Sequence, residues 1–258
     1  MNLAESILRK YIRQLLKEGV YDPGIFKAVF MAGGPGSGKS HTAKAVFGGD
    51  VNAAQATATA SGLKLVNSDP AFEMFLKKAD VDPADLGTIS PEEFEKLTVG
   101  KSSPRSKAKR LRDAQRAGYL QGSLGIVVDG TGDDYTKIAE KKEVMEDLGY
   151  DTMMLFVNTS LEVAQERNRK RDRKLPDDLV EEIWQDVQQN MGSFQTLFGR
   201  KNFIIVDNTV YGPLPEEIEK AALAFVKQPV QNSIGQEKIQ QMLSDKGPEA
   251  RLPKQRSN

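Results

Sequence analysis

The sequence predicts a doubly wound α/β fold, in which a mostly parallel five-stranded sheet carries helices on both faces. Five short apolar segments alternate with helical segments along the 258 residues. Each apolar segment is a nearly continuous run, which is typical of parallel strands that are covered on both faces. The chain is long enough for one large α/β domain or two small ones. In such a fold, ligands bind at the carboxyl ends of the strands.

A glycine-rich segment follows the first expected strand, Ala28–Ala32, and reads GGPGSGKSH. It matches the phosphate-binding P-loop pattern G-x-x-x-x-G-K-[ST] and is followed by a helix expected from Lys39 onward, so the fold is predicted to be a P-loop NTPase. Backbone N–H groups and the helix N-terminus would bind ATP phosphates, Lys39 would reach the β- and γ-phosphates, and Ser40 would bind Mg²⁺. The predicted nucleotide-binding residues are Gly33, Gly34, Pro35, Gly36, Ser37, Gly38, Lys39, Ser40 and His41.

The remaining elements follow from apolar runs, periodicity and helix start and stop signals. Further strands are expected at Leu63–Val66, Ile126–Val128, Thr152–Val157 and Phe203–Val206. Helices are expected at Phe72–Lys78, Pro91–Leu97, Tyr135–Leu148, Leu161–Lys170, Pro176–Leu197 and Pro215–Lys227, with a shorter one at Gln236–Leu243.

Two aspartates lie at expected strand ends and are candidates for chemistry. Asp129 follows the third strand, where a carboxylate would hold Mg²⁺ opposite Ser40; the alternative is an ordinary Asp-Gly turn. Asp69 follows the second strand, where it could accept the proton of an attacking hydroxyl; the alternative is capping of the helix that follows, with Ser68 as another possible cap.

Two basic segments stand out. The segment 167–174, RNRKRDRK, predicts a lid whose Arg167 and Arg171 share a helical face and would neutralise charge on the γ-phosphate. The segment Lys101–Arg116 carries seven basic residues against one acid. It could bind a phosphorylated substrate or nucleic acid, or be a solvated face, and no aromatic residue interleaves with it before Tyr119.

Composition limits the function classes. The 36 basic and 36 acidic side chains cancel, which gives no global attraction to nucleic acid or membranes. The chain has no cysteine and one histidine, which excludes thiol catalysis, Cys-ligated zinc and multi-histidine metal sites. No apolar run approaches a membrane span, and we expect a cytoplasmic protein.

Three regions are expected. Residues 1–20 contain an amphipathic helix that could pack on the domain or bind a protein partner. Residues 21–228 form the P-loop domain, and residues 229–258 form a polar, partly disordered extension.

The motifs GGPGSGKS, NSD after the second strand, DGTG after the third and the lid arginines together resemble the zeta-toxin and polynucleotide-kinase-like group of P-loop kinases, and also predicted kinases of tailed phages. The resemblance covers about Phe26 to Val226 and implies Lys39 and Ser40 on ATP·Mg²⁺, Asp69 as base, and Arg167 and Arg171 on a lid. Members of this group usually carry an acceptor-binding arginine shortly after the catalytic aspartate. Here the residues at 70–74 are PAFEM, which leaves the acceptor open.

The predicted function is transfer of the ATP γ-phosphate to a hydroxyl acceptor, which could be a small molecule, a nucleotide sugar or a nucleic-acid 5′ end. The alternative is a nucleotide-binding assembly or regulatory protein that hydrolyses ATP slowly or not at all.

Overall fold

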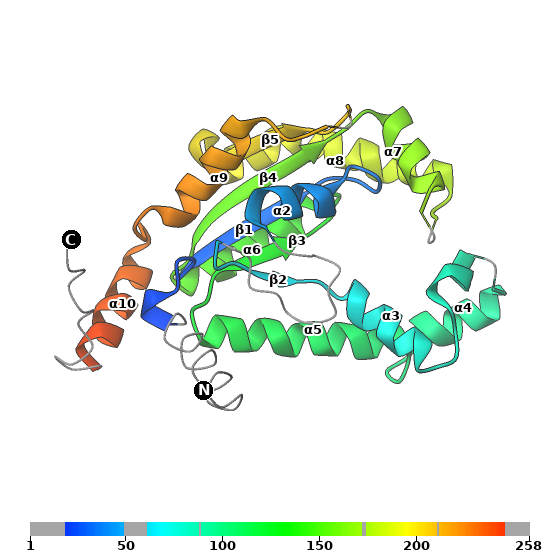
Figure 1. Ribbon diagram of the computed structural model, residues 1–258, viewed down its shortest axis with the longest axis horizontal. Coiled ribbons are helices and arrows are strands. Elements are labelled where there is room, and N and C mark those ends of the chain that lie inside the picture. Colours follow the sequence, from blue (N-terminus) through cyan, green and yellow to red (C-terminus); the bar gives the residue numbers. More distant parts are fainter. Residues whose placement is uncertain (1–18, 49–60, 88, 172–173, 211, 246–258) are drawn as a thin grey trace, which may run out of the picture.

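The computed structural model describes residues 19–48, 61–87, 89–171, 174–210 and 212–245 (Figure 1). Its centre is one five-stranded sheet. The strands are β1 (Lys27–Ala32), β2 (Lys64–Val66), β3 (Ile126–Asp129), β4 (Asp151–Asn158) and β5 (Phe203–Asp207). All five expected strands are confirmed, with their bounds shifted by one residue at most, because each is a run of apolar residues that the sheet buries.

The strand order is β2-β3-β1-β4-β5, and every neighbouring pair is parallel. The central strand is therefore β1, which leads into the P-loop. The register pairs Met31 with Asp129 on β3, and Ala32 with Phe156 on β4. This register brings the end of β3 directly beside the start of the P-loop.

Helices cover both faces of the sheet, as a doubly wound fold requires. The α-helices are α2 (Lys39–Phe47), α3 (Asp69–Lys77), α4 (Pro91–Thr98), α5 (Pro104–Gln121), α6 (Tyr135–Asp147), α7 (Leu161–Arg169), α8 (Asp177–Phe198), α9 (Glu216–Lys227) and α10 (Ser233–Asp245). Three short 3₁₀ helices span Gly19–Tyr21, Pro83–Gly87 and Arg200–Asn202.

Alternation along β1 divides the core into two layers. Ala28, Phe30 and Ala32 pack with apolar side chains of α6 and α8 on one face. Val29 and Met31 pack with α2 and α9 on the other face. A third, smaller core joins α3, α4 and α5 beyond the β2 edge; Figure 1 shows α3 and α4 beyond the carboxyl end of β2 and α5 running alongside this strand.

The last described helix, α10, packs on the domain and is longer than the expected Gln236–Leu243 helix. Asp151 at the start of β4 accepts hydrogen bonds from the backbone N–H groups of Gln231 and Asn232 and forms an ion pair of 2.6 Å with the buried Lys27. Ile239 and Met242 pack against the core layer that contains α6 and α8. These contacts tie the chain after α9 to the sheet.

The expected N-terminal helix, the segment 49–60 and the last 13 residues lie outside the described residues. Among the helices that the structure describes, none is long and apolar enough to cross a membrane.

Candidate active site

The P-loop connects β1 to α2, and its glycines adopt backbone conformations that other residues rarely adopt. Gly36 has φ +78°, and a Cβ there would lie 2.2 Å from the Ala164 carbonyl oxygen on α7. Gly38 has φ +90°, and a Cβ there would lie 2.0 Å from the side-chain nitrogen of Asn208. Glycine is therefore required at both positions, because a side chain would collide with the elements that hold the loop in place.

Two further interactions fix the shape of the loop. The N–H of Gly33 donates to the Thr131 carbonyl after β3 (2.8 Å), and the Asn208 side chain after β5 donates to the Ser37 carbonyl (2.7 Å). The buried Ser37 hydroxyl has no hydrogen-bond partner within the described residues. The loop is thus preorganised by contacts with the residues after β3 and β5, and the Ser37 hydroxyl stays available to bind a ligand.

Lys39 begins α2, as predicted, and its side chain folds back onto the loop. Its amine donates to the carbonyl of Gly33 and, at 3.3 Å, to that of Gly34. Burial lowers the pKa of Lys39, and the Asp129 carboxylate opposes that shift. The amine occupies the concave side of the loop with backbone oxygens as its partners, which a phosphate oxygen could replace.

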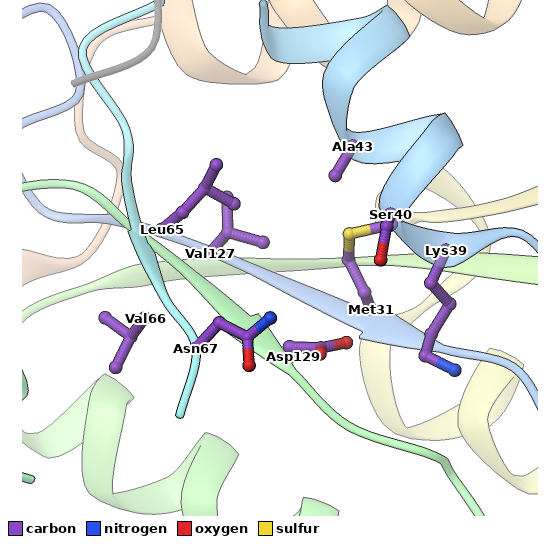
Figure 2. Close-up of a pocket in the computed structure, with 9 residues that line it drawn as sticks. All are labelled: Met31, Lys39, Ser40, Ala43, Leu65, Val66, Asn67, Val127 and Asp129. Carbon is purple, nitrogen blue, oxygen red and sulfur yellow. The ribbon is translucent and has the colours of Figure 1, made fainter. Parts of the chain in front are cut away.

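Ser40 and Asp129 line the same open cleft. Figure 2 shows Asp129 between Asn67 and Lys39, with the Ser40 hydroxyl on the α2 side. Burial by the surrounding protein raises the pKa of the Asp129 carboxyl, although the side chain is still accessible from the cleft. Lys39 opposes this shift.

A carboxylate and a hydroxyl that face one cleft are suitable Mg²⁺ ligands when phosphate oxygens and water complete the coordination. The described residues contain no cluster of three or more histidine, cysteine or acidic side chains suited to a metal. The donor set of Ser40 and Asp129 therefore fits a metal that arrives with a nucleotide.

Asp69 lies at the carboxyl end of β2 and is the first residue of α3, three residues before the expected helix start. The expected start at Phe72 is wrong because the Asp-Pro pair already takes helical geometry. Ser68 is the N-cap residue, without a side-chain capping bond, and the Asn67 side chain instead accepts from the Asp69 N–H (2.9 Å). The Asp69 carboxylate is therefore not used as the helix cap.

The carboxylate of Asp69 instead binds Arg105 of α5, whose Nη1 lies 2.9 Å from Oδ1. The guanidinium also lies over the Phe72 ring, 5.0 Å from its centroid. Arg105 does not stand out in the sequence, because it is 36 residues from Asp69 and belongs to a segment that also fits a solvated face. Arg105 thus supplies a basic group beside Asp69, which the residues at 70–74 do not.

The two predicted lid arginines lie on the other side of the P-loop. Arg167, near the end of α7, has a buried Nη1 without a partner among the described residues, and a Cβ on Gly38 would lie 3.9 Å from this atom. Arg171 is exposed, yet close enough to lower the pKa of Lys39. Asn168 fixes this turn through two hydrogen bonds with the backbone of Leu175. Residues 172 and 173 of the expected lid lie outside the described residues.

The other predicted residues are placed as follows. Gly34 lies beside α8, where a Cβ would be 3.8 Å from Trp184 Cα. Pro35 is half-buried at the tip of the loop, and His41 is exposed on α2, one residue after Ser40. The structure does not bring His41 into the cleft.

The long helix α8 joins the loops around the site. The Trp184 indole donates to the Thr159 carbonyl (2.8 Å), and Gln188 donates to the Asn158 side chain (2.9 Å), both at the carboxyl end of β4. Two residues further along α8, Asn190 donates to the carbonyls of Gly132 and Asp133 after β3. Sequence periodicity showed this helix but not which loops its amides bind.

Comparison with known proteins identifies the domain. Residues 29–194 match the AAA domain family. No curated protein sequence gives a significant match. Among solved structures, a chain of the Pnkp1/Rnl/Hen1 RNA repair complex is 17% identical with a TM-score of 0.45; the match covers 66% of this protein and 46% of that chain, so the protein spans less than half of its length.

Two other solved structures are similar over more of their length. A chain of the PezAT toxin-antitoxin system of Streptococcus pneumoniae is 14% identical with a TM-score of 0.47, over 93% of this protein and 94% of that chain. A putative kinase from Chloroflexus aurantiacus is 16% identical with a TM-score of 0.45, over 80% of this protein and 100% of that chain. The family match covers more than half of the chain; the protein therefore belongs to the AAA domain family, and its parallel sheet with a P-loop is an α/β P-loop NTPase fold.

Proposed function

We propose that the protein is a phosphotransferase that moves the ATP γ-phosphate to a hydroxyl group of an acceptor. The observation that carries the proposal is the proximity of three charged groups: Lys39 and Asp129 line the cleft, and Asp69 follows Asn67, which also lines it. Asp69 and Asp129 both act electrostatically on Lys39, and Asp69 also acts on Asp129, although each comes from a different strand end. A second carboxylate at this position could accept the proton of an attacking hydroxyl group.

Each residue then has a specific role. The P-loop N–H groups and Lys39 would bind the phosphates. Ser40 and Asp129 would hold Mg²⁺, which neutralises charge on the phosphate oxygens when it is bound. Arg167 would leave its unpartnered position beside Gly38 to neutralise charge that develops on the γ-phosphate, with Arg171 next to it.

The transfer balances as follows. The acceptor oxygen forms a bond to the γ-phosphorus while the bond between that phosphorus and the β–γ bridging oxygen breaks, and ADP leaves. The proton of the acceptor hydroxyl passes to Asp69, which is more than one-third exposed and therefore accessible to an acceptor.

The motifs that resemble zeta toxins and polynucleotide kinases support placement in that group of kinases. They leave three acceptor classes open: small molecules, nucleotide sugars and nucleic-acid 5′ ends. The structure favours none of the three through Asp69 alone, since a carboxylate base serves any hydroxyl.

The test is transfer of γ-labelled phosphate from ATP to three acceptor pools: small metabolites with nucleotide sugars, 5′-hydroxyl oligonucleotides, and protein. The control pair is Lys39→Ala and Lys44→Ala. Both lysines belong to α2, but Lys44 is exposed on its far turn. We expect label in one pool, retained in Lys44→Ala and lost in Lys39→Ala.

Tight ATP binding with no label in any pool, beyond slow release of free phosphate, would contradict the proposal. That result would favour the nucleotide-binding assembly or regulatory protein, with the N-terminal segment as its candidate partner-binding element.

A further inference from the structure

Asn67 follows β2 directly and lies at the same level of the sheet as Asp129. The parallel register of β2 and β3 pairs Val66 with Val128, the residues just before them. Its next pair is therefore Asn67 with Asp129. Neighbouring strands are about 4.8 Å apart, and residues at paired positions of a parallel sheet project to the same face. Both side chains accordingly line the cleft that also contains Lys39, as Figure 2 shows.

One hydrogen bond fixes the orientation of the Asn67 amide. Its side-chain carbonyl oxygen accepts from the backbone N–H of Asp69 at 2.9 Å. Because a backbone N–H can only donate, the atom that it binds must be the carbonyl oxygen and not the NH₂ group. The contact is an Asx turn, in which asparagine binds the backbone two residues later. The position of the amide nitrogen is therefore defined by the chain itself.

The NH₂ group of Asn67 is a donor without an assigned role. It donates to no atom of the residues that the structure describes. The side chain is half-buried at the wall of the cleft, so this group is partly withdrawn from water. Polar groups in protected positions are almost always hydrogen-bonded, which indicates that a ligand in the cleft is the partner of this one.

The chemistry of the cleft limits what this donor can bind. An amide NH₂ group donates and does not accept, so its partner is an oxygen or nitrogen atom and not a metal ion. Asn67 lies next to two carboxylates, those of Asp129 on the neighbouring strand and of Asp69 two residues later. A third carboxylate at this position would repel a nucleotide phosphate, whereas a neutral donor attracts one of its charged oxygens.

We propose that the NH₂ group of Asn67 donates a hydrogen bond to an oxygen of the γ-phosphate of ATP. The inference rests on the proposed function: a base at Asp69 must lie beside the group that the hydroxyl attacks, and Asn67 contacts Asp69 directly. Asn67 then distinguishes the two nucleotides, since ATP presents a γ-phosphate oxygen and ADP does not. The same amide positions the backbone of the base through its carbonyl oxygen.

The test compares two nucleotides and needs no acceptor. ADP or a non-hydrolysable ATP analogue, each with Mg²⁺, is titrated into the full-length protein by calorimetry. Asn67→Ala should weaken binding of the ATP analogue by about tenfold or more, because a hydrogen bond to a charged oxygen is lost. Binding of ADP should change by less than about twofold.

Ser68→Ala is the matched control for this comparison. Ser68 is the next residue of the same turn, and its side chain makes no capping hydrogen bond with α3. This variant should bind both nucleotides as the unmodified protein does. Equal losses of affinity for ADP and the ATP analogue in Asn67→Ala, or no loss for either, would overturn the inference.

Asn67→Ser separates the donor from the turn. A serine hydroxyl can still accept from the Asp69 N–H, but it is attached directly to Cβ and extends less far into the cleft than the amide nitrogen. We expect Asn67→Ser to bind the ATP analogue as weakly as Asn67→Ala does. A full ATP preference in Asn67→Ser would show that Asn67 serves only the turn and would overturn the inference. Circular dichroism verifies that each variant is folded, and Asn67→Ser carries the comparison if Asn67→Ala is not.

The two proposals fail in different ways. If the Asn67 variants lose the preference for the ATP analogue but no acceptor pool takes label, the phosphotransferase proposal fails and the γ-phosphate contact stands. If label passes to an acceptor and Asn67→Ala keeps its preference for the ATP analogue, the contact fails and the phosphotransferase stands. A protein that binds neither nucleotide would overturn both.

Discussion

Replacing Asp69 with asparagine tests the proposed base with almost no change of shape. A positioned general base typically contributes 10²- to 10⁴-fold to a rate, which corresponds to about 3–5 kcal/mol in the barrier. The Asp69→Asn variant should therefore transfer phosphate about 100 to 10,000 times more slowly. Its stability should fall by less than about 1 kcal/mol, because the ion pair that is lost with Arg105 is partly exposed.

Nucleotide affinity should change little in this variant, since Asp69 lies on α3 and its charge acts on Lys39 less strongly than the charge of Asp129 does. The assay is single-turnover transfer of γ-labelled phosphate to the acceptor found in the pool experiment, with nucleotide binding measured in parallel. Glu73→Gln is the matched control, because Glu73 is exposed one turn later on α3. Normal transfer by Asp69→Asn, with transfer by Glu73→Gln also normal, would refute the assignment of Asp69 as base.

Two further predictions concern stability and the P-loop. Lys27→Met leaves the carboxylate of Asp151 buried without its ion-pair partner, since the two side chains are 1% and 9% exposed. The free energy of unfolding, measured with denaturant, should fall by about 3–5 kcal/mol. A loss below about 1 kcal/mol would contradict the importance of this pair. Gly36→Ala should abolish nucleotide binding in a titration, because its Cβ would lie 2.2 Å from the Ala164 carbonyl oxygen. The control Gly118→Ala places a Cβ where no atom lies within 4 Å, and this variant should bind nucleotide normally. Nucleotide binding by Gly36→Ala would show that the loop can move.

The sheet was predictable because each strand is apolar on both faces. Burial of β1 is complete along its length, so its position followed from apolar residues alone. The spatial order of the strands was not available from the sequence, because it depends on where each crossover helix packs. That order is what places β3, and with it Asp129, next to the P-loop strand.

The P-loop was the most predictable part of the site, because its chemistry is local in sequence. Lys39 begins α2 at the expected residue, and the glycine positions follow from backbone conformation. The contacts of Arg105 with Asp69 and of Asn208 with Ser37 were not predicted, because each acts across a long sequence separation. Asn208 supports the Ser37 carbonyl from 171 residues away, and no periodicity in either segment shows that contact.

Substitution of Asp129 can distinguish its two possible roles, which are a Mg²⁺ ligand and an ordinary turn residue. Asparagine is as suitable as aspartate for a turn, but it lacks the charge that Mg²⁺ requires. If Asp129 is a ligand, Asp129→Asn should bind nucleotide equally with and without Mg²⁺, whereas the unmodified protein should bind more tightly with it. Titrations in Mg²⁺ and in a chelator measure this difference. Asp133→Asn, in the next turn, is the control for a general loss of negative charge near Lys39.

The thermal stability of the ligand-free Asp129→Asn protein gives a second test, because the substitution should weaken the Mg²⁺ effect but not the fold. Burial raises the pKa of Asp129 in the folded state above its unfolded value, so the ionised carboxylate costs folding free energy at neutral pH, and protonation relieves that cost as pH falls through the raised pKa. Asparagine removes the charge and should leave the thermal midpoint equal or higher at neutral pH. A variant with a lower midpoint and an intact Mg²⁺ effect would indicate that Asp129 serves the turn and not the metal. A residue that is kept charged at a cost in stability, and whose loss removes the metal effect, is retained for the ligand.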